Sequence, residues 1–174
     1  IRAEAQRLAS PRETLLQVNR LLLDMSRASL FVTVFYGVLD LARGKLCYVR
    51  AGHDYPLLFR SSAGNSQFLG GVGIVLGMLD AVELEEIEVD LDTGDELVLY
   101  TDGITEANDD SGNEEYGRDR LLHVLRAARH LDPIAIVDRV FTDVEAFSAV
   151  SPPADDQTLV VVKRQLSTPE EIPA

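Results

Sequence analysis

The chain has 174 residues, 46% of them hydrophobic and 26% charged, with a formal net charge of −13. This composition is typical of one globular domain with a sizeable core. The acidic balance argues against a nucleic-acid partner, because phosphate backbones would be repelled. No apolar stretch approaches the roughly 20 residues that span a bilayer, so we expect no membrane insertion in this segment. No signal peptide is recognisable, and the single Cys47 suits a reducing compartment, so we expect a cytoplasmic protein.

Two helices are expected at the beginning of the chain. Residues 1–9 resemble a helix without an N-terminal cap, and the chain starts without methionine, so we expect a fragment or a processed product. Ser10, Pro11 and Glu13 then form a capping-box pattern, which predicts a helix over Pro11–Met25. Its expected apolar face consists of Leu15, Val18, Leu22 and Met25.

The middle of the chain carries strand-like segments joined mainly by short turns. Residues 30–40 are apolar on both alternating faces, which predicts a strand covered on both sides. A turn at 40–44 and a returning strand at 45–52 predict a hairpin. Further strands are expected at residues 56–60, 87–91, 96–101 and 158–163, with a glycine-rich loop around residues 70–77.

Two more helices are expected before the last strand, after a polar loop at residues 108–115. The first begins near Gly117, and the second is opened by Asp132 and Pro133. Their expected buried residues are Leu121, Leu122, Leu125 and Ala128 in the first, and Val137, Val140, Phe141 and Val144 in the second. This order predicts an α+β fold with a largely antiparallel sheet. We expect one domain over residues 1–164 and a flexible tail over 165–174.

Acidic residues occur at the ends of two predicted strands that are far apart in the sequence. Asp102 follows the strand at 96–101 and is itself followed by Gly103, while Asp155 and Asp156 precede the strand at 158–163. Carboxylate oxygens are suited to hard cations such as Mg²⁺ and Mn²⁺. Taken singly, each aspartate is more often a turn residue or a helix cap than a ligand. A metal site therefore requires that neighbouring strands bring the two strand ends together.

Two motifs that also rely on acidic residues fit the sequence poorly. Haloacid-dehalogenase-type phosphatases use an Asp-Gly strand end, but their nucleophile lies near the start of the domain with a second acid two residues on. Here the strand comes late in the chain. The segment 108–115, "NDDSGNEE", does not have the ligand spacing or the glycine position of an EF-hand.

Five segments in order resemble the bacterial sigma-factor-regulating branch of the metal-dependent PPM (type 2C) protein phosphatases, typified by stage II sporulation protein E. They are "FVTVFYGVLD", "YVRAGHDYPLL", "GIVLGM", "GDELVLYTDGITEA" and "ADDQTLVVVK". The resemblance implies an α-β-β-α sandwich of mostly antiparallel sheets flanked by helices. It also implies removal of phosphate from phosphoserine and phosphothreonine, using two Mn²⁺ or Mg²⁺ ions that share a hydroxide and need no protein nucleophile.

The resemblance assigns expected roles to individual residues. Asp102 and Asp155 match metal ligands, and Gly103 allows a tight backbone turn beside the metal. Asp156 is expected to support the ligands without binding an ion. Apart from the resemblance, the position of Thr101 predicts either a hydrogen bond that supports Asp102 or simple stabilisation of the turn. His53, in "AGHDYP", is expected to pack or form hydrogen bonds rather than act as a general base.

One motif of the family has no counterpart in this sequence. Relatives carry an earlier strand end resembling Gly-Asp-Val-Ser-Gly, which supplies another bridging aspartate, so we expect the domain to be N-terminally incomplete. A chain without that motif would bind metal weakly and turn over poorly. The alternative hypothesis is a non-catalytic regulatory module that keeps the phosphatase fold. Expected partners are a phosphorylated anti-anti-sigma (STAS-type) protein and an upstream sensor or receiver domain in the full-length protein.

Overall fold

The structure, a computed structural model, describes residues 10–25, 31–62, 64–148 and 155–165. These residues fall into two compact units. Unit 1 comprises the described residues up to Tyr55 together with Gln67–Thr93, and unit 2 comprises Pro56–Ser66 and the described residues from Gly94 onward. The helix expected at residues 1–9 and all but the first residue of the tail expected at 165–174 lie outside the described residues. The prediction of one domain over residues 1–164 stays a prediction.

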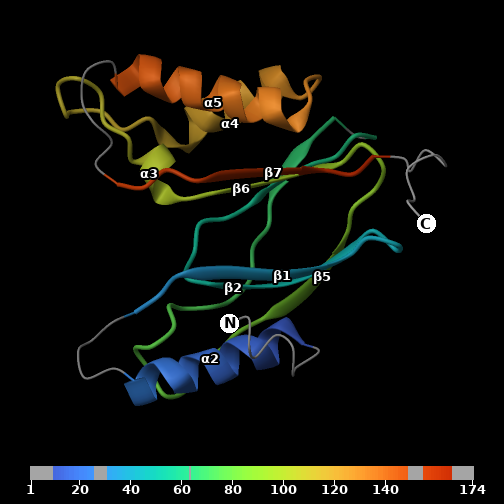
Figure 1. The fold of residues 1–174 in the computed structure, drawn as a ribbon, viewed down its shortest axis with the longest axis vertical. Coiled ribbons are helices and arrows are strands. Elements are labelled where there is room, and N and C mark those ends of the chain that lie inside the picture. Colours follow the sequence, from blue (N-terminus) through green and yellow to red (C-terminus); the bar gives the residue numbers. More distant parts are fainter. Residues whose placement is uncertain (1–9, 26–30, 63, 149–154, 166–174) are drawn as a thin grey trace, which may run out of the picture. The chain divides into compact units, whose positions relative to one another are not determined.

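Unit 1 is built on a three-stranded antiparallel sheet with one helix, α2 (Pro11–Met25), across one face (Figure 1). The strands lie in the order β1-β2-β5, and their bounds are Val34–Asp40, Lys45–Ala51 and Glu86–Asp90. The predicted hairpin is confirmed, because β1 and β2 pair antiparallel with Asp40 opposite Lys45.

Helix α2 has the bounds that the capping pattern predicts. The Ser10 hydroxyl oxygen accepts the Glu13 backbone N–H at 3.3 Å, as the box requires, and the same hydroxyl donates to the Glu86 carboxylate of β5. Leu15 and Val18 are buried on the sheet, but Met25 is 80% exposed. The prediction that Met25 belongs to the buried face is therefore wrong, because it is the last residue of the helix and the core does not extend that far.

Strand β1 is less covered than its apolar sequence predicts. Its residues are half-buried or exposed, with Val38 45% exposed. Within the described residues β1 is an edge strand that pairs only with β2. A side chain on an edge strand lacks neighbours on one side, so the prediction of complete cover on both faces is wrong.

Unit 2 contains most of a second antiparallel sheet, with helices α4 (Gly117–Ala128) and α5 (Pro133–Ser148) packed side by side over one face (Figure 1). The strands lie in the order β4-β3-β6-β7. Their bounds are Ser66–Phe68, Leu57–Phe59, Glu96–Tyr100 and Leu159–Lys163. Both predicted helices are confirmed.

The core of unit 2 lies between this sheet and the two helices. Its buried members include Phe59 and Val98 from the strands and Leu121, Leu125 and Val140 from the helices. Two elements were not predicted. The short strand β4 lacks a clear alternation in sequence, and Asp102–Thr105 forms a single helical turn, α3, where a simple turn was expected. No helix among the described residues is both long and apolar enough to cross a membrane.

Candidate metal site at the ends of β6 and β7

Asp102 stands where the chain changes from strand to helix. The preceding Thr101 keeps an extended conformation with φ −97° and ψ 158°, and Asp102 is the first residue of α3. The carboxylate is exposed, and its Oδ1 accepts the backbone N–H of Gly103 at 3.0 Å. This bond orients the side chain at the end of β6.

Asp155 has the same local arrangement on the other strand. It is exposed, and its Oδ1 accepts the backbone N–H of Asp156 at 2.7 Å. Strands β6 and β7 are antiparallel neighbours with Tyr100 opposite Leu159, so the end of β6 lies beside the beginning of β7. The structure thus brings together the two strand ends that the sequence separates by more than fifty residues.

Thr101 connects the two strand ends through both its backbone and its side chain. Its backbone N–H donates to the Thr158 carbonyl at 3.1 Å, and its hydroxyl oxygen accepts the Thr158 N–H at 2.9 Å. The same hydroxyl donates to the Asp156 carbonyl at 3.1 Å. The threonine expected to support Asp102 therefore acts on the segment that follows Asp155.

Gly103 lies against the backbone of the other strand end. A Cβ atom built on Gly103 would stand 2.5 Å from the Asp156 carbonyl oxygen and 3.0 Å from its carbonyl carbon. Only glycine fits at this separation without moving one of the two segments. In addition, Gln157 donates its Nε2–H to the Gly103 carbonyl at 3.0 Å. Nothing in the sequence singles out Gln157, because its partner is 54 residues away.

The donor chemistry of this site fits a hard divalent cation, although the pair is not a full ligand set. Each aspartate keeps one carboxylate oxygen outside the hydrogen bond to its own following N–H, and both side chains are exposed. Within the described ranges, no group of three or more histidine, cysteine, aspartate or glutamate side chains is placed to hold a metal ion. Asp102 and Asp155 would therefore need further ligands, and water can supply some of them.

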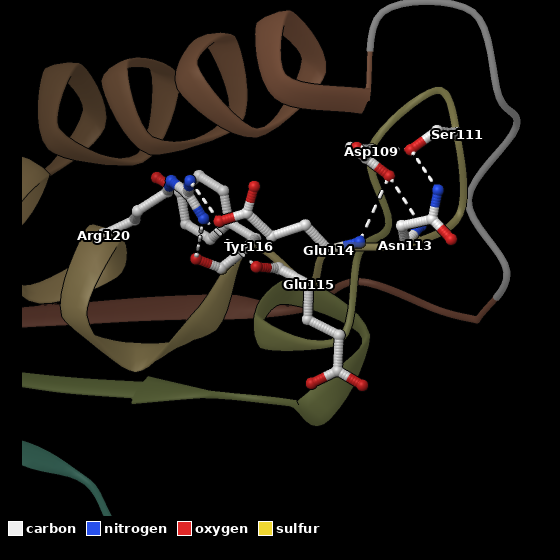
Figure 2. Close-up of polar contacts among 7 residues, drawn as sticks. All are labelled: Asp109, Ser111, Asn113, Glu114, Glu115, Tyr116 and Arg120. Carbon is white, nitrogen blue, oxygen red and sulfur yellow. Dashed lines mark hydrogen bonds and ion pairs between the residues drawn. The ribbon is translucent and has the colours of Figure 1, made fainter.

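The polar segment after α3 is an ordered hairpin rather than an open loop. Asn108 and Glu115 form an isolated antiparallel bridge, and Asp109 organises the turn between them (Figure 2). Its Oδ1 accepts the N–H of Asn113 at 2.9 Å, and its Oδ2 accepts the Ser111 hydroxyl at 2.8 Å. The hydroxyl of Ser111 and the backbone N–H groups lower the pKa of Asp109. Both carboxylate oxygens of Asp109 therefore accept hydrogen bonds within the turn. This agrees with the conclusion from the sequence that the segment is not an EF-hand calcium site.

Tyr116 fixes the end of this hairpin in the core of unit 2. Its ring is 1% exposed and packs edge-on against Phe147, and its hydroxyl donates to Asp143 of α5 at 2.8 Å. Burial, assisted by that carboxylate, raises the pKa of Tyr116. Arg120 donates to Glu114 at 2.8 Å and to the Tyr116 carbonyl at 3.2 Å, which ties the hairpin to α4 (Figure 2).

His53 belongs to unit 1 and makes a modest contact there. Its Nδ1 lies 3.5 Å from the Thr33 hydroxyl, and its carbonyl accepts the Arg50 guanidinium at 2.8 Å. Arg50 also donates to the Gly71 carbonyl and stacks on Tyr55. These contacts give the "AGHDYP" segment a structural role in holding its own loop.

Comparison with known proteins decides the family. A family model described as Stage II sporulation protein E (SpoIIE) matches residues 1–165. The chain belongs to the SpoIIE family. The resemblance carried by the five sequence segments is thereby confirmed, and with it the PPM-type branch.

Individual relatives agree with this assignment. Protein IcfG of Synechocystis sp. is 32% identical over 136 residues, which cover 78% of this SpoIIE-family chain and 21% of that protein. Phosphoserine phosphatase RsbU of Bacillus subtilis is 31% identical over 103 residues, covering 59% of this chain and 30% of that protein. The chain thus spans less than a third of the length of these two relatives.

A solved structure shares the fold. The phosphatase domain of SpoIIE from Bacillus subtilis, presoaked with manganese, aligns with a TM-score of 0.65 at 19% identity, covering 97% of this chain and 73% of that chain. This likeness confirms the predicted fold class of helices and mostly antiparallel sheets.

Proposed function

We propose that this chain is the catalytic part of a metal-dependent protein phosphatase that hydrolyses phosphoserine or phosphothreonine. The observation that carries the proposal is the contact between the two strand ends, where the carbonyl of Asp156 lies against Gly103 and both carboxylates are exposed. Membership of the SpoIIE family and the similarity to a phosphoserine phosphatase support the same activity.

In this proposal Asp102 and Asp155 hold Mn²⁺ or Mg²⁺, with two ions in the working site. The bound ions supply a water of lowered pKa and offset the negative charge of the phosphate. Gly103 lets the two strand ends approach, and Thr101 holds them in register. The backbone carbonyl of Asp156 accepts the Thr101 hydroxyl, and in this proposal Asp156 supports the segment without binding an ion.

The proposed substrate is a phosphorylated regulatory protein of the anti-anti-sigma (STAS) type, and an upstream sensor or receiver domain would control access to it. In this proposal the hydrolysis takes place in the cytoplasm. The support comes from the resemblance of the five sequence segments to the sigma-factor-regulating branch of the PPM phosphatases.

The decisive experiment compares Asp102→Asn with the unchanged full-length protein. Hydrolysis of a phosphoserine peptide and of para-nitrophenyl phosphate is measured while Mn²⁺ is titrated. Replacing a ligand carboxylate should reduce turnover by more than the about 10–100-fold typical of residues one step removed from a metal. A matched control is Asp138→Asn, an exposed aspartate on α5, which should keep the Mn²⁺-dependent rate.

Two outcomes would overturn the proposal. Full Mn²⁺-dependent activity in Asp102→Asn would remove Asp102 from the metal site. Absence of both Mn²⁺ binding and hydrolysis in the unchanged full-length protein would favour the alternative, a regulatory module that keeps the fold without the chemistry.

A further inference from the structure

The short segment between Asp155 and β7 is attached to the turn of Asp102 at two separate points. One attachment is the Thr101 hydroxyl, which bonds to the backbone of Asp156 and Thr158. The other is the side chain of Gln157, whose Nε2 donates to the Gly103 carbonyl at 3.0 Å. The two attachments flank Asp102 in the sequence, since Thr101 precedes it and Gly103 follows it.

We propose that Gln157 is a positioning residue for the metal site, which sets the separation of the Asp102 and Asp155 carboxylates. The inference rests on the proposed function. Gln157 acts through a single residue, because the Gly103 that receives its hydrogen bond also donates its own N–H to the Asp102 carboxylate at 3.0 Å. On its other side Gln157 adjoins Asp156, whose N–H orients the Asp155 carboxylate at 2.7 Å.

Thr101 bonds to two residues of this segment, which define an axis but leave rotation about that axis possible. With Thr101 alone, the segment of Asp155 could pivot about the hydrogen bonds at Asp156 and Thr158. The bond from Gln157 removes that freedom. Ligand side chains must be held within about 0.5 Å of their working geometry, so a pivot of this kind weakens binding of the ion without unfolding the strand.

The role is separable from the stability of the sheet. Gln157 lies before the first residue of β7, and its side chain takes no part in the five-residue pairing of β6 with β7. The side chain is half-buried and does not belong to the apolar core of unit 2. Its removal should therefore change metal affinity more than it changes the melting temperature of the metal-free protein.

The test uses the full-length protein and Mn²⁺ alone as the probe. Isothermal titration calorimetry gives the Mn²⁺ dissociation constant, and thermal melting in EDTA reports the fold without metal. Gln157→Met keeps the length of the side chain but has no donor. We expect the dissociation constant to rise about threefold to tenfold, the range of one hydrogen bond to a backbone carbonyl, with little change in melting temperature. The matched control is Gln165→Met, an exposed glutamine after β7 that should bind Mn²⁺ like the unchanged protein.

A second variant separates positioning from direct contact with the metal. Gln157→Glu has the same shape, but its carboxylate cannot donate to the Gly103 carbonyl at neutral pH. If Gln157 positions the site, this variant should bind Mn²⁺ no more tightly than the unchanged protein at high ionic strength, where salt screens the attraction of the added charge. Tighter binding that persists at high ionic strength would overturn the inference, because it would mean that the side chain at this position reaches the ion itself.

The remaining outcomes distinguish this inference from the proposed function. If the unchanged protein binds Mn²⁺ and hydrolyses phosphoserine, and Gln157→Met binds it equally well, the positioning role is wrong and the phosphatase stands. A melting temperature that falls with an unchanged dissociation constant would show a purely structural role and would also overturn the inference. If the unchanged protein does not bind Mn²⁺, the proposed function fails and the inference fails with it.

Discussion

The carbonyl group of Asp156 occupies the space that a side chain on Gly103 would need. The distance from an ideal Cβ to that oxygen is 2.5 Å, and both atoms that would clash belong to backbone. A backbone atom cannot swing away as the end of a long side chain can. The separation of the two strand ends is therefore set by the absence of one methyl group.

Gly103→Ala should separate the strand ends and weaken both metal binding and folding. Inserting a methyl group into a fully packed position costs about 1–3 kcal/mol of unfolding free energy. The same displacement should raise the Mn²⁺ dissociation constant. Chemical denaturation and calorimetry on the full-length protein measure the two effects.

Gly70→Ala is the matched control for this substitution. A Cβ on Gly70 meets no atom within 4 Å, and Gly70 does not have a positive φ. It should leave Mn²⁺ affinity unchanged and alter stability little. Equal effects of the two substitutions would contradict the packing argument.

Glu96 gives the stability of the protein a specific dependence on pH. The residue is 2% exposed, and this burial raises the pKa of its carboxyl group above the ordinary 4.5. The ammonium group of Lys163, whose Nζ lies 3.7 Å from the Glu96 Oε2, opposes this shift. A group with a raised folded-state pKa stabilises fully below its unfolded pKa and loses that contribution as the pH rises through the folded value. The unfolding free energy of the unchanged protein, relative to Glu96→Gln, should therefore fall as the pH rises from 4.5.

Urea denaturation at a series of pH values measures this difference. Lys163→Met provides an internal check, because removing the nearby cation should raise the pKa of Glu96 further and extend the fall to higher pH. A difference that grows with pH would mean that attraction to Lys163 outweighs the cost of burial.

Tyr116→Phe should loosen the hairpin at residues 107–116. The substitution keeps the packed ring but removes the 2.8 Å hydrogen bond to Asp143. A hydrogen bond to a carboxylate contributes about 1.5–3 kcal/mol, and since Asp143 is only half-buried we expect a loss of about 1–2 kcal/mol in unfolding free energy. Amide hydrogen exchange should become faster at residues 108–115.

Asp143→Asn tests whether the hairpin is stabilised by the hydrogen-bond acceptor at residue 143 or by the negative charge of that residue. Asparagine keeps an oxygen that can accept the Tyr116 hydroxyl, so this substitution should cost less than Tyr116→Phe. A larger cost for Asp143→Asn would show that the charge of Asp143, and not its contact with Tyr116, stabilises the hairpin.

Capping residues and apolar periodicity in the sequence predicted helices and strands well wherever these patterns were clear. The capping pattern at Ser10 and the proline at residue 133 predicted where α2 and α5 begin, and alternation predicted β5 to within one residue. The predictions of burial failed at the end of helix α2 and along the edge strand β1. Met25 and β1 are more exposed than their apolar character suggests, because exposure depends on which neighbours lie beside a residue, and a periodic pattern does not contain that information.

The sequence by itself determined that two acidic strand ends exist, that glycine follows the first, and that the chain has the segments of a SpoIIE-family protein. It could not determine that these ends touch, because contact between residues more than fifty positions apart depends on the antiparallel register of β6 and β7. Only the tertiary structure showed the approach of Asp156 to Gly103 and the bond from Gln157. The physical reason is that side chains such as Gln157 acquire a role from the partner that folding places opposite them.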